Sequence, residues 1–181
     1  LEMTLVILDR DGVINKDSVH SIKSPEEWVP IEGSLEAISL LNKNGYTVVV
    51  ATNQSAIGKK LISNVTLDNI HKKMQDLLDK KKGKIDKIFY CPHVKEDGCA
   101  CRKPKTGLMQ KIKEHYSINL EKIPAIGDSR RDLEAYSKSE AQPILVRTGN
   151  GKDVEKKKSF PSNTLIFDNL LEASKFIIKM E

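Results

Sequence analysis

Residues 5–15 read LVILDRDGVIN, an apolar run that ends in two aspartates and a glycine. Four consecutive apolar residues, Leu5–Leu8, are typical of a parallel strand that is covered on both faces of its sheet. Asp9 and Asp11 follow, and side chains two positions apart in an extended chain point the same way. We therefore expect both carboxylates to face one cavity at the carboxyl end of this strand.

Two carboxylates this close repel each other unless a cation lies between them or one is protonated. The pair therefore suits Mg²⁺, a hard ion that prefers oxygen ligands. We expect Arg10 to point away from the cavity, and Gly12 to let the chain turn sharply. The alternative is an aspartate-rich turn without catalytic function, because short motifs of this kind are common.

Similar apolar runs recur along the chain and alternate with helical patterns. Beyond the first strand, the expected strands are Tyr46–Ala51, Ile85–Tyr90, Pro124–Ile126, Ile144–Val146 and Leu165–Phe167. Apolar residues recur at helical spacing in the segments 35–41, 67–77, 108–112, 129–133 and 170–177. This alternation predicts an α/β fold with a doubly wound, mainly parallel sheet, in which ligands bind beyond the carboxyl ends of the strands.

The composition is that of an ordinary globular domain. The chain has 181 residues, of which 39% are hydrophobic and 30% charged, so we expect one domain over residues 3–181, with Leu1 and Glu2 a cloning remnant. No apolar run approaches the length of a membrane span, and no secretory signal pattern is visible. Lysine runs add to the net charge of +5; they are interpreted as solvated surface, with attraction of a polyanion or a phosphorylated substrate as the alternative.

Hydrogen-bonding side chains follow the second expected strand. Thr52, Asn53, Gln54 and Ser55 come directly after a buried apolar run. They are suited to donate hydrogen bonds to phosphate oxygens or to a hydroxylated substrate. The alternative is a polar turn that caps the next segment.

A second acidic group follows the fourth expected strand, in the stretch GDSRRDL. Asp128 ends this strand and is placed to complete a Mg²⁺ site. Asp132 lies one helical turn further on, where it would orient its neighbours, including Ser129. The alternative is simple capping of the helix that begins here.

All three cysteines fall in one short loop, CPHVKEDGCACRKPK, residues 91–105. Cys91 and His93 form one short chelating pair, and Cys99 and Cys101 form another. Three thiolates and one imidazole are typical of a closed structural zinc site, whereas soft sulfur ligands exclude Mg²⁺. The alternative is three incidental free thiols; an odd, clustered number of thiols in either case favours a reducing compartment, the cytoplasm.

Cations follow the thiol loop directly. A zinc ion would fold this excursion and fix Arg102 and Lys103, the residues after the last ligand. A carboxylate that attacks a phosphate dianion meets charge repulsion, which preorganised cations relieve. We therefore expect at least one of Arg102, Lys103 and Lys105 to reach the rim of the acidic site.

These motifs, in this order and each behind its own strand, resemble those of the haloacid dehalogenase superfamily of phosphotransferases. The resemblance runs from Leu5 to about Gly151. It implies that Asp9 is the nucleophile, which forms an aspartyl-phosphate, and that Asp11 is the general acid and base. It also implies that Thr52 and Lys103 bind the transferring phosphoryl group.

The same resemblance implies that Mg²⁺ is held by Asp9, by the backbone carbonyl of Asp11 and by Asp128. The connections 14–30 and 54–66 are too short for a separate cap domain. We therefore expect a comparatively open site that the thiol loop covers in part. Such a site suits a small phosphorylated sugar.

The zinc loop is similar to that of one subgroup, whose members dephosphorylate either heptose 1,7-bisphosphate or histidinol phosphate. The stretches LDRDGVINKDS, SPEEW, ATNQSAIG and LVRTGNGK resemble the heptose branch more closely. The resemblance thus implies removal of the 7-phosphate of the heptose, in biosynthesis of the lipopolysaccharide core. Histidinol phosphate is the first alternative, and another small molecule or a polynucleotide 3′-phosphate is the second.

The resemblance also implies which residues contact the substrate beyond the reacting phosphate. A segment after the first motif would contact sugar hydroxyls or the second phosphate; its residues are Asp17, Ser18, Val19 and His20. Arg102 would grip the anomeric phosphate, because a planar guanidinium binds phosphate through two hydrogen bonds. Ser129 stands where some relatives carry lysine.

Two other classes of protein are less compatible with the sequence. A non-catalytic receiver domain would need its phosphoacceptor after the third strand, where Tyr90 and Cys91 stand. A zinc-containing nucleic-acid binder would need aromatic stacking positions, but aromatic residues are only 5%. We therefore expect a monomeric enzyme with neither a nucleic acid nor a membrane as its partner.

Overall fold

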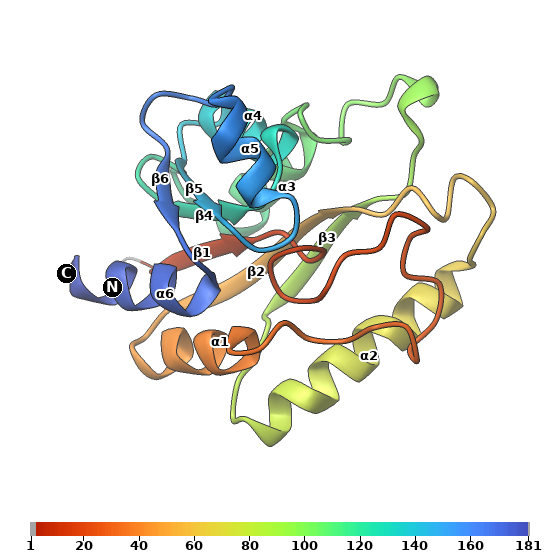
Figure 1. The fold of residues 1–181 in the computed structure, drawn as a ribbon, viewed down its shortest axis with the longest axis horizontal. Helices are drawn as coiled ribbons and strands as arrows, with labels where there is room; N and C mark the ends of the chain where they lie inside the picture. Colours follow the sequence, from red (N-terminus) through yellow and green to blue (C-terminus); the bar gives the residue numbers. More distant parts are fainter. Residues whose placement is uncertain (1–2, 181) are drawn as a thin grey trace.

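The computed structural model describes residues 3–180 and contains one six-stranded sheet (Figure 1). Its strands are β1 (Leu5–Leu8), β2 (Thr47–Asn53), β3 (Lys87–Cys91), β4 (Pro124–Gly127), β5 (Gln142–Val146) and β6 (Leu165–Phe167). Their order across the sheet is β3-β2-β1-β4-β5-β6, and every neighbouring pair is parallel. The prediction of a doubly wound parallel sheet is confirmed.

Some strands are longer than the apolar runs that predicted them. β2 continues through Thr52 and Asn53, which pair with Tyr90 and Cys91 of β3. Backbone pairing continues here after the side chains become polar, so apolar patterning alone misplaces the strand end. Two of the expected phosphate-binding residues therefore belong to a strand rather than to the loop after it.

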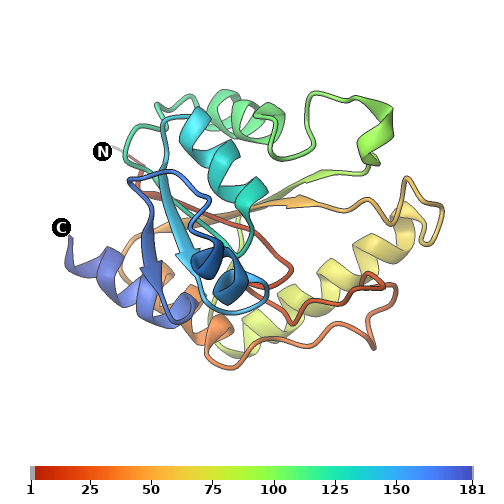
Figure 2. The same cartoon turned by 45° about the horizontal axis from the view of Figure 1, so that its top comes forward.

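Helices cover both faces of the sheet (Figures 1 and 2). One face carries α1 (Ser34–Lys43), α2 (Asn64–Lys80) and α6 (Leu170–Lys179), and the other carries α3 (Gly107–Tyr116), α4 (Arg130–Lys138) and the short α5 (Gly151–Lys157). Along β1, Val6 and Leu8 enter one core while Leu5 and Ile7 enter the other. This two-sided burial explains why the strand is apolar at every position.

The direction of chain progression reverses between β1 and β4. Strands β2 and β3 extend the sheet on one side of β1, and β4 to β6 extend it on the other. Ile7 pairs with Ala125, and Leu8 pairs with Ile126. Open α/β sheets bind ligands beyond the carboxyl ends of the strands at such a reversal, so this edge is where the site is expected.

The connections around this edge contain little regular structure. The segment 9–33 holds only isolated bridges, and the segment 92–106 holds one short 3₁₀ helix, η1 (Lys95–Asp97). Lys73 of α2 donates to the carbonyl oxygens of Pro25 and Trp28, both at 2.7 Å, and so fastens the first connection to the helix. Within residues 3–180, the helices are all too short or too polar to cross a lipid bilayer.

Candidate active site

The two aspartates of the first motif lie at the point where the sheet reverses direction. Asp9 follows β1, and its backbone N–H donates to Ile126 O of β4 at 2.9 Å. Asp9 and Asp11 both line one cavity of about 250 Å³, as the spacing predicts. Arg10 points away from this cavity, but its guanidinium folds back to bind the Asp11 carboxylate at 2.8 Å.

Lys103 joins the two acidic motifs. Its side chain is buried, and Nζ lies 3.2 Å from Asp9 Oδ1 and 2.7 Å from Asp132 Oδ1. Nζ also donates to the carbonyl oxygen of Ala51 at 2.7 Å. Burial alone would lower the pKa of Lys103, but the charges of Asp132 and Asp9 hold that pKa above its usual value, so the lysine is a fixed cation.

Asn53 lines the same cavity and also positions this lysine. Its side-chain oxygen accepts the backbone N–H of Lys103 at 3.0 Å, and its Nδ2 donates to Lys103 O at 3.1 Å. This reciprocal pair fastens the residue after the thiol loop to the end of β2. The Lys103–Pro104 peptide bond is cis.

Asp128 is held between two glycines. A Cβ atom added at either Gly12 or Gly149 would collide with Asp128 Oδ2, and both glycines have positive φ angles, of 84° and 56°. The same oxygen accepts the backbone N–H of Asn150 at 2.9 Å. Thr148 Oγ1 donates to Gly12 O at 2.7 Å, so the loop after β5 closes on the first motif.

The three buried carboxylates Asp9, Asp128 and Asp132 offer oxygens within 4.8 Å of one another. Burial, together with the charge of Asp132, raises the pKa of Asp9 to about 7, although Lys103 opposes this. Burial and the charges of Asp132 and Asp9 raise the pKa of Asp128 to about 9. The single charge of Lys103 does not balance three crowded carboxylates, and their hard oxygen donors fit Mg²⁺.

Both oxygens of Asp132 are already bound to protein groups. Oδ1 contacts Lys103, and Oδ2 accepts the Ser129 hydroxyl at 2.9 Å and the backbone N–H of Asp128 at 3.2 Å. Ser129 Oγ in turn accepts the backbone N–H of Asp132, which makes a capping box at the start of α4. Asp132 therefore caps α4 through Oδ2, and its other oxygen also fixes Lys103.

Thr52 and Gln54 lie beside Asp11. Gln54 Nε2 lies 3.0 Å from both Asp11 Oδ2 and Thr52 Oγ1. Burial alone would raise the pKa of Asp11, but Arg10 and the hydrogen bonds from Asn15 and Gln54 hold that pKa below its usual value. Without substrate, Asp11 is therefore a carboxylate.

The cavity brings together most of the predicted substrate and metal residues. Its lining includes the predicted residues Asp9, Asp11, Asp17, Ser18, Asn53, Gln54, Ser55, Arg102, Lys103, Asp128, Ser129 and Asp132. Thr52 is buried and is not among the lining residues, but its Oγ1 lies 3.0 Å from Nε2 of Gln54, which does line the cavity. Lys59 and Arg131 add two cations that the sequence did not single out.

Val19 and His20 are not among the residues that line the cavity, so their contact with a substrate stays a prediction. The chain turns at this point, with the N–H of Ser21 donating to Ser18 O and Ser21 at a φ of 66°. This turn leaves Val19 96% exposed and directs His20 to solvent. A sequence segment does not reveal which side of such a turn faces the site.

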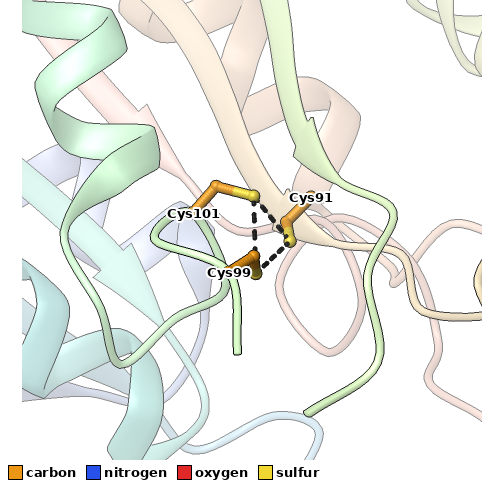
Figure 3. A group of neighbouring side chains, drawn as sticks. All are labelled: Cys91, Cys99 and Cys101. Atoms are coloured by element: carbon orange, nitrogen blue, oxygen red, sulfur yellow. Dashed lines mark hydrogen bonds between the residues drawn. The ribbon is translucent and has the colours of Figure 1, made fainter. Parts of the chain in front are cut away.

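The three cysteines gather at the end of β3 (Figure 3). Cys101 Sγ lies 2.9 Å from Cys91 Sγ and 3.7 Å from Cys99 Sγ, and the third distance is 3.6 Å. Tetrahedral zinc with Zn–S bonds of about 2.3 Å would separate its sulfurs by about 3.8 Å. Two of the three separations thus match a thiolate-bound metal, and the distance between Cys91 Sγ and Cys101 Sγ would have to lengthen by about 0.9 Å.

His93 does not join the three sulfurs in this structure. Its Nδ1 lies 3.6 Å from Asp97 Oδ2, and nearly half of its side chain is exposed. Arg102, which follows the last cysteine, contacts the carbonyl oxygen of His93 at 3.4 Å. The structure therefore assembles three of the four expected ligands.

Comparison with known proteins identifies the family. The family model for polynucleotide kinase 3 phosphatase matches residues 4–161. D-glycero-beta-D-manno-heptose-1,7-bisphosphate 7-phosphatase from Pseudomonas putida is 49% identical over 176 residues, which cover 97% of this chain and 100% of the relative. The corresponding protein from Bordetella bronchiseptica is 44% identical over 177 residues, covering 98% and 99%.

A solved structure agrees over the same length. The crystal structure of D,D-heptose 1,7-bisphosphate phosphatase from B. bronchiseptica, complexed with magnesium and phosphate, superposes with a TM-score of 0.98 at 43% identity. The match covers 99% of this chain and 100% of that one. The chain belongs to the heptose-1,7-bisphosphate 7-phosphatase family. The predicted resemblance to heptose-bisphosphate phosphatases is therefore confirmed, and the chain is a phosphatase.

Sequence reasoning missed several residues around this site. Asn150, in the stretch TGNGK, binds Asp128, and its side chain also lies 3.4 Å from Asp17. Arg10 and His71 form a buried contact of 3.1 Å behind Asp11. A signal for Asn150 was its place just after a strand, whereas nothing in the helical pattern of α2 distinguishes His71 as more than a core residue.

Proposed function

We propose that this chain removes the 7-phosphate of D-glycero-β-D-manno-heptose 1,7-bisphosphate, in biosynthesis of the lipopolysaccharide core. The observation that carries the proposal is the contact of Lys103 with Asp9 beside Asp128. This arrangement puts a carboxylate nucleophile, a fixed cation and a second carboxylate against one cavity. The full-length likeness to heptose bisphosphatases supports the choice of sugar.

The first step is transfer of the phosphoryl group to the protein. An Asp9 carboxylate oxygen attacks phosphorus, and the bond between phosphorus and the sugar oxygen breaks. The electron pair goes to that oxygen, which takes a proton from Asp11. Asp11 must first gain this proton, since it is a carboxylate in the free protein; the approach of a phosphate dianion favours that protonation.

The second step releases phosphate. Asp11, now ionised, takes a proton from a water molecule as the water oxygen attacks phosphorus. The aspartyl-phosphate bond breaks, and its electron pair returns to Asp9. Lys103 and the hydroxyl of Thr52 bind the phosphoryl oxygens in both steps.

Asp9, Asp128 and the backbone carbonyl of Asp11 would hold Mg²⁺. When bound, the ion neutralises charge on the phosphoryl oxygens and on the crowded carboxylates. Asp132 and Ser129 keep Lys103 in place and leave Asp128 available to the metal.

Zinc would bind Cys91, Cys99 and Cys101, with His93 as the fourth ligand after its side chain turns from Asp97. A zinc ion held by these residues would close the loop between β3 and Lys103. Its role is structural, because the sulfurs lie outside the catalytic cavity. It would fix the backbone from which Arg102 and Lys103 project.

Substrate selection rests on the charge of the cavity. Arg102, Lys59 and Arg131 line it in addition to Lys103, which favours a substrate with a second phosphate over histidinol phosphate. Asp17 and Ser18 are placed for sugar hydroxyls. A polynucleotide 3′-phosphate is less favoured, because none of the described lining residues is aromatic and available for base stacking.

The proposal also covers the protein's surroundings. Residues 3–181 act as one catalytic domain of a monomer in the cytoplasm, without nucleic-acid or membrane partners. All catalytic side chains come from one chain, and the clustered thiols suit a reducing compartment. Size-exclusion chromatography with light scattering tests the monomer directly.

The experiment that tests the substrate compares kcat/KM for heptose 1,7-bisphosphate, histidinol phosphate and a 3′-phosphorylated oligonucleotide, each with Mg²⁺. We expect the bisphosphate to be preferred by at least about tenfold, the value of one additional charge-assisted contact. Equal or faster turnover of histidinol phosphate or of the oligonucleotide would refute the assignment.

A further inference from the structure

Arg10 is fully buried, and among residues 3–180 it neither lines the cavity nor contacts an acidic residue other than Asp11. Its Nε and Nη2 donate to Asp11 Oδ1 at 3.1 and 2.8 Å. Its Nη1 lies 3.1 Å from Nε2 of His71, in the middle of α2. The guanidinium therefore bridges a helix in the outer layer and the carboxylate after β1.

The direction of the contact with His71 follows from the chemistry of arginine. A guanidinium has only donors, so the imidazole Nε2 must accept the hydrogen bond. His71 is buried, and burial next to Arg10 lowers the pKa of His71 to about 3. The ring is neutral, as an acceptor must be.

The two oxygens of Asp11 have different surroundings as a result. Oδ1 receives three N–H donors, two from Arg10 and one from Asn15 at 2.9 Å. Oδ2 receives one, from Gln54 at 3.0 Å. An oxygen that accepts three donors has no room for a proton, whereas Oδ2 has a free lone pair.

We propose that His71 is a positioning residue for Asp11. By fixing Arg10, it keeps Oδ1 occupied and leaves Oδ2 as the oxygen that carries the proton to the leaving group. As the phosphorus–oxygen bond breaks, that proton passes from Oδ2 to the sugar oxygen, which receives the electron pair. The inference rests on the proposed role of Asp11 as general acid.

A purely structural role for His71 makes a different prediction. A leaving group whose conjugate acid has a low pKa, such as p-nitrophenolate, departs without a proton. A sugar alkoxide needs a proton as it leaves. Loss of proton delivery slows only the alkyl ester. Loss of fold or of Mg²⁺ binding slows both.

The experiment measures kcat/KM, which reports the steps up to departure of the leaving group, for heptose 1,7-bisphosphate and for p-nitrophenyl phosphate. The variants are His71→Leu, which has no acceptor, and His71→Gln, whose side-chain oxygen replaces Nε2. Lys72→Gln, on the exposed face of α2, is the matched control. We expect His71→Leu to lose about 10- to 100-fold on the sugar phosphate and less than about threefold on the aryl phosphate. His71→Gln should recover most of the sugar-phosphate rate.

An equal loss on both substrates, or no loss on either, would overturn the positioning role. If His71→Leu does not fold, His71→Asn serves instead, because its side chain is polar but too short to reach Arg10. A wild-type chain that turns over neither ester would refute the proposed function itself, and the inference with it. Wild-type activity with an equal loss refutes the inference alone.

Discussion

Lys103 Nζ lies 3.2 Å from Asp9 Oδ1, although 94 residues separate the two in the chain. The contact exists because β1 and β2 are neighbours in the sheet and Asn53 ties Lys103 to the end of β2. It connects the thiol loop to the nucleophile. The first prediction concerns this contact.

Replacement of Lys103 by methionine should lower kcat by about 10²- to 10³-fold, the cost of losing one preorganised donor at a developing charge. The buried carboxylates of Asp9 and Asp132 would then repel each other without compensation, so the melting temperature should also fall. Steady-state kinetics and thermal unfolding measure the two effects. Lys111→Met, on the exposed side of α3, is the control, and similar kinetics for both variants would contradict the role.

Asp128 should destabilise the metal-free protein as pH rises. Its pKa is raised to about 9 in the folded state from 3.8, so between these values the folded state binds more protons than the unfolded state. Stability therefore falls with increasing pH through this window. Asp128→Asn removes this penalty, and without metal it should melt several degrees above the wild type near pH 8, with a smaller difference near pH 5.

Mg²⁺ should reverse the order of the two melting temperatures near pH 8. The ion stabilises the wild-type carboxylates, so its addition near pH 8 should raise the melting temperature of the wild type more than that of Asp128→Asn. Unfolding curves with a chelator and with Mg²⁺ over the pH range measure both effects. A variant that remains less stable than the wild type in chelator at every pH contradicts this account.

The glycine behind Asp128 offers a second test of the same site. Gly149→Ala places a methyl group against Asp128 Oδ2, whereas Gly45→Ala, at a similarly positive φ, meets nothing within 4 Å. Both variants should lose about 1–2 kcal/mol of stability from backbone strain. Only Gly149→Ala should also weaken Mg²⁺ activation, and equal activation of the two variants would argue against the close approach.

The thiol loop predicts one zinc ion for each chain, measured by elemental analysis of the purified protein. Cys99→Ser should lose the zinc and lower the melting temperature, because a structural zinc site contributes directly to folding. His93→Ala should weaken zinc retention against a chelator, whereas His115→Ala, on α3, should not. Wild-type protein without zinc, and with the same melting temperature as Cys99→Ser, would end the structural-metal proposal.

Most of the fold followed from apolar runs and their order. β1 and β6 have the predicted bounds, because their polar flanks coincide with the strand ends. β2 was placed too short, because pairing with β3 continues through polar side chains. A run of apolar residues indicates which part of a strand is buried. The hydrogen bonds between β2 and β3 continue past the end of that run.

The candidate site was predictable where a chemically suited residue directly follows a predicted strand, as at Asp9 and Asp128. Lys103 was predictable because it directly follows the thiol loop. It was not predictable where side-chain direction decides. Val19 faces solvent because of a local turn, and Asn53, which lines the cavity, uses both ends of its amide to bind the backbone of Lys103. His71 acts through Arg10, a contact that only the placement of α2 reveals.

The central claim is that Asp9 becomes phosphorylated during turnover, and acid quenching followed by mass spectrometry tests it most directly. In the wild type with Mg²⁺ and heptose 1,7-bisphosphate, we predict covalent phosphate on the peptide that contains Asp9, and in Asp9→Asn neither that adduct nor phosphate release. Full turnover by Asp9→Asn, or phosphate trapped on a different residue, would contradict the account.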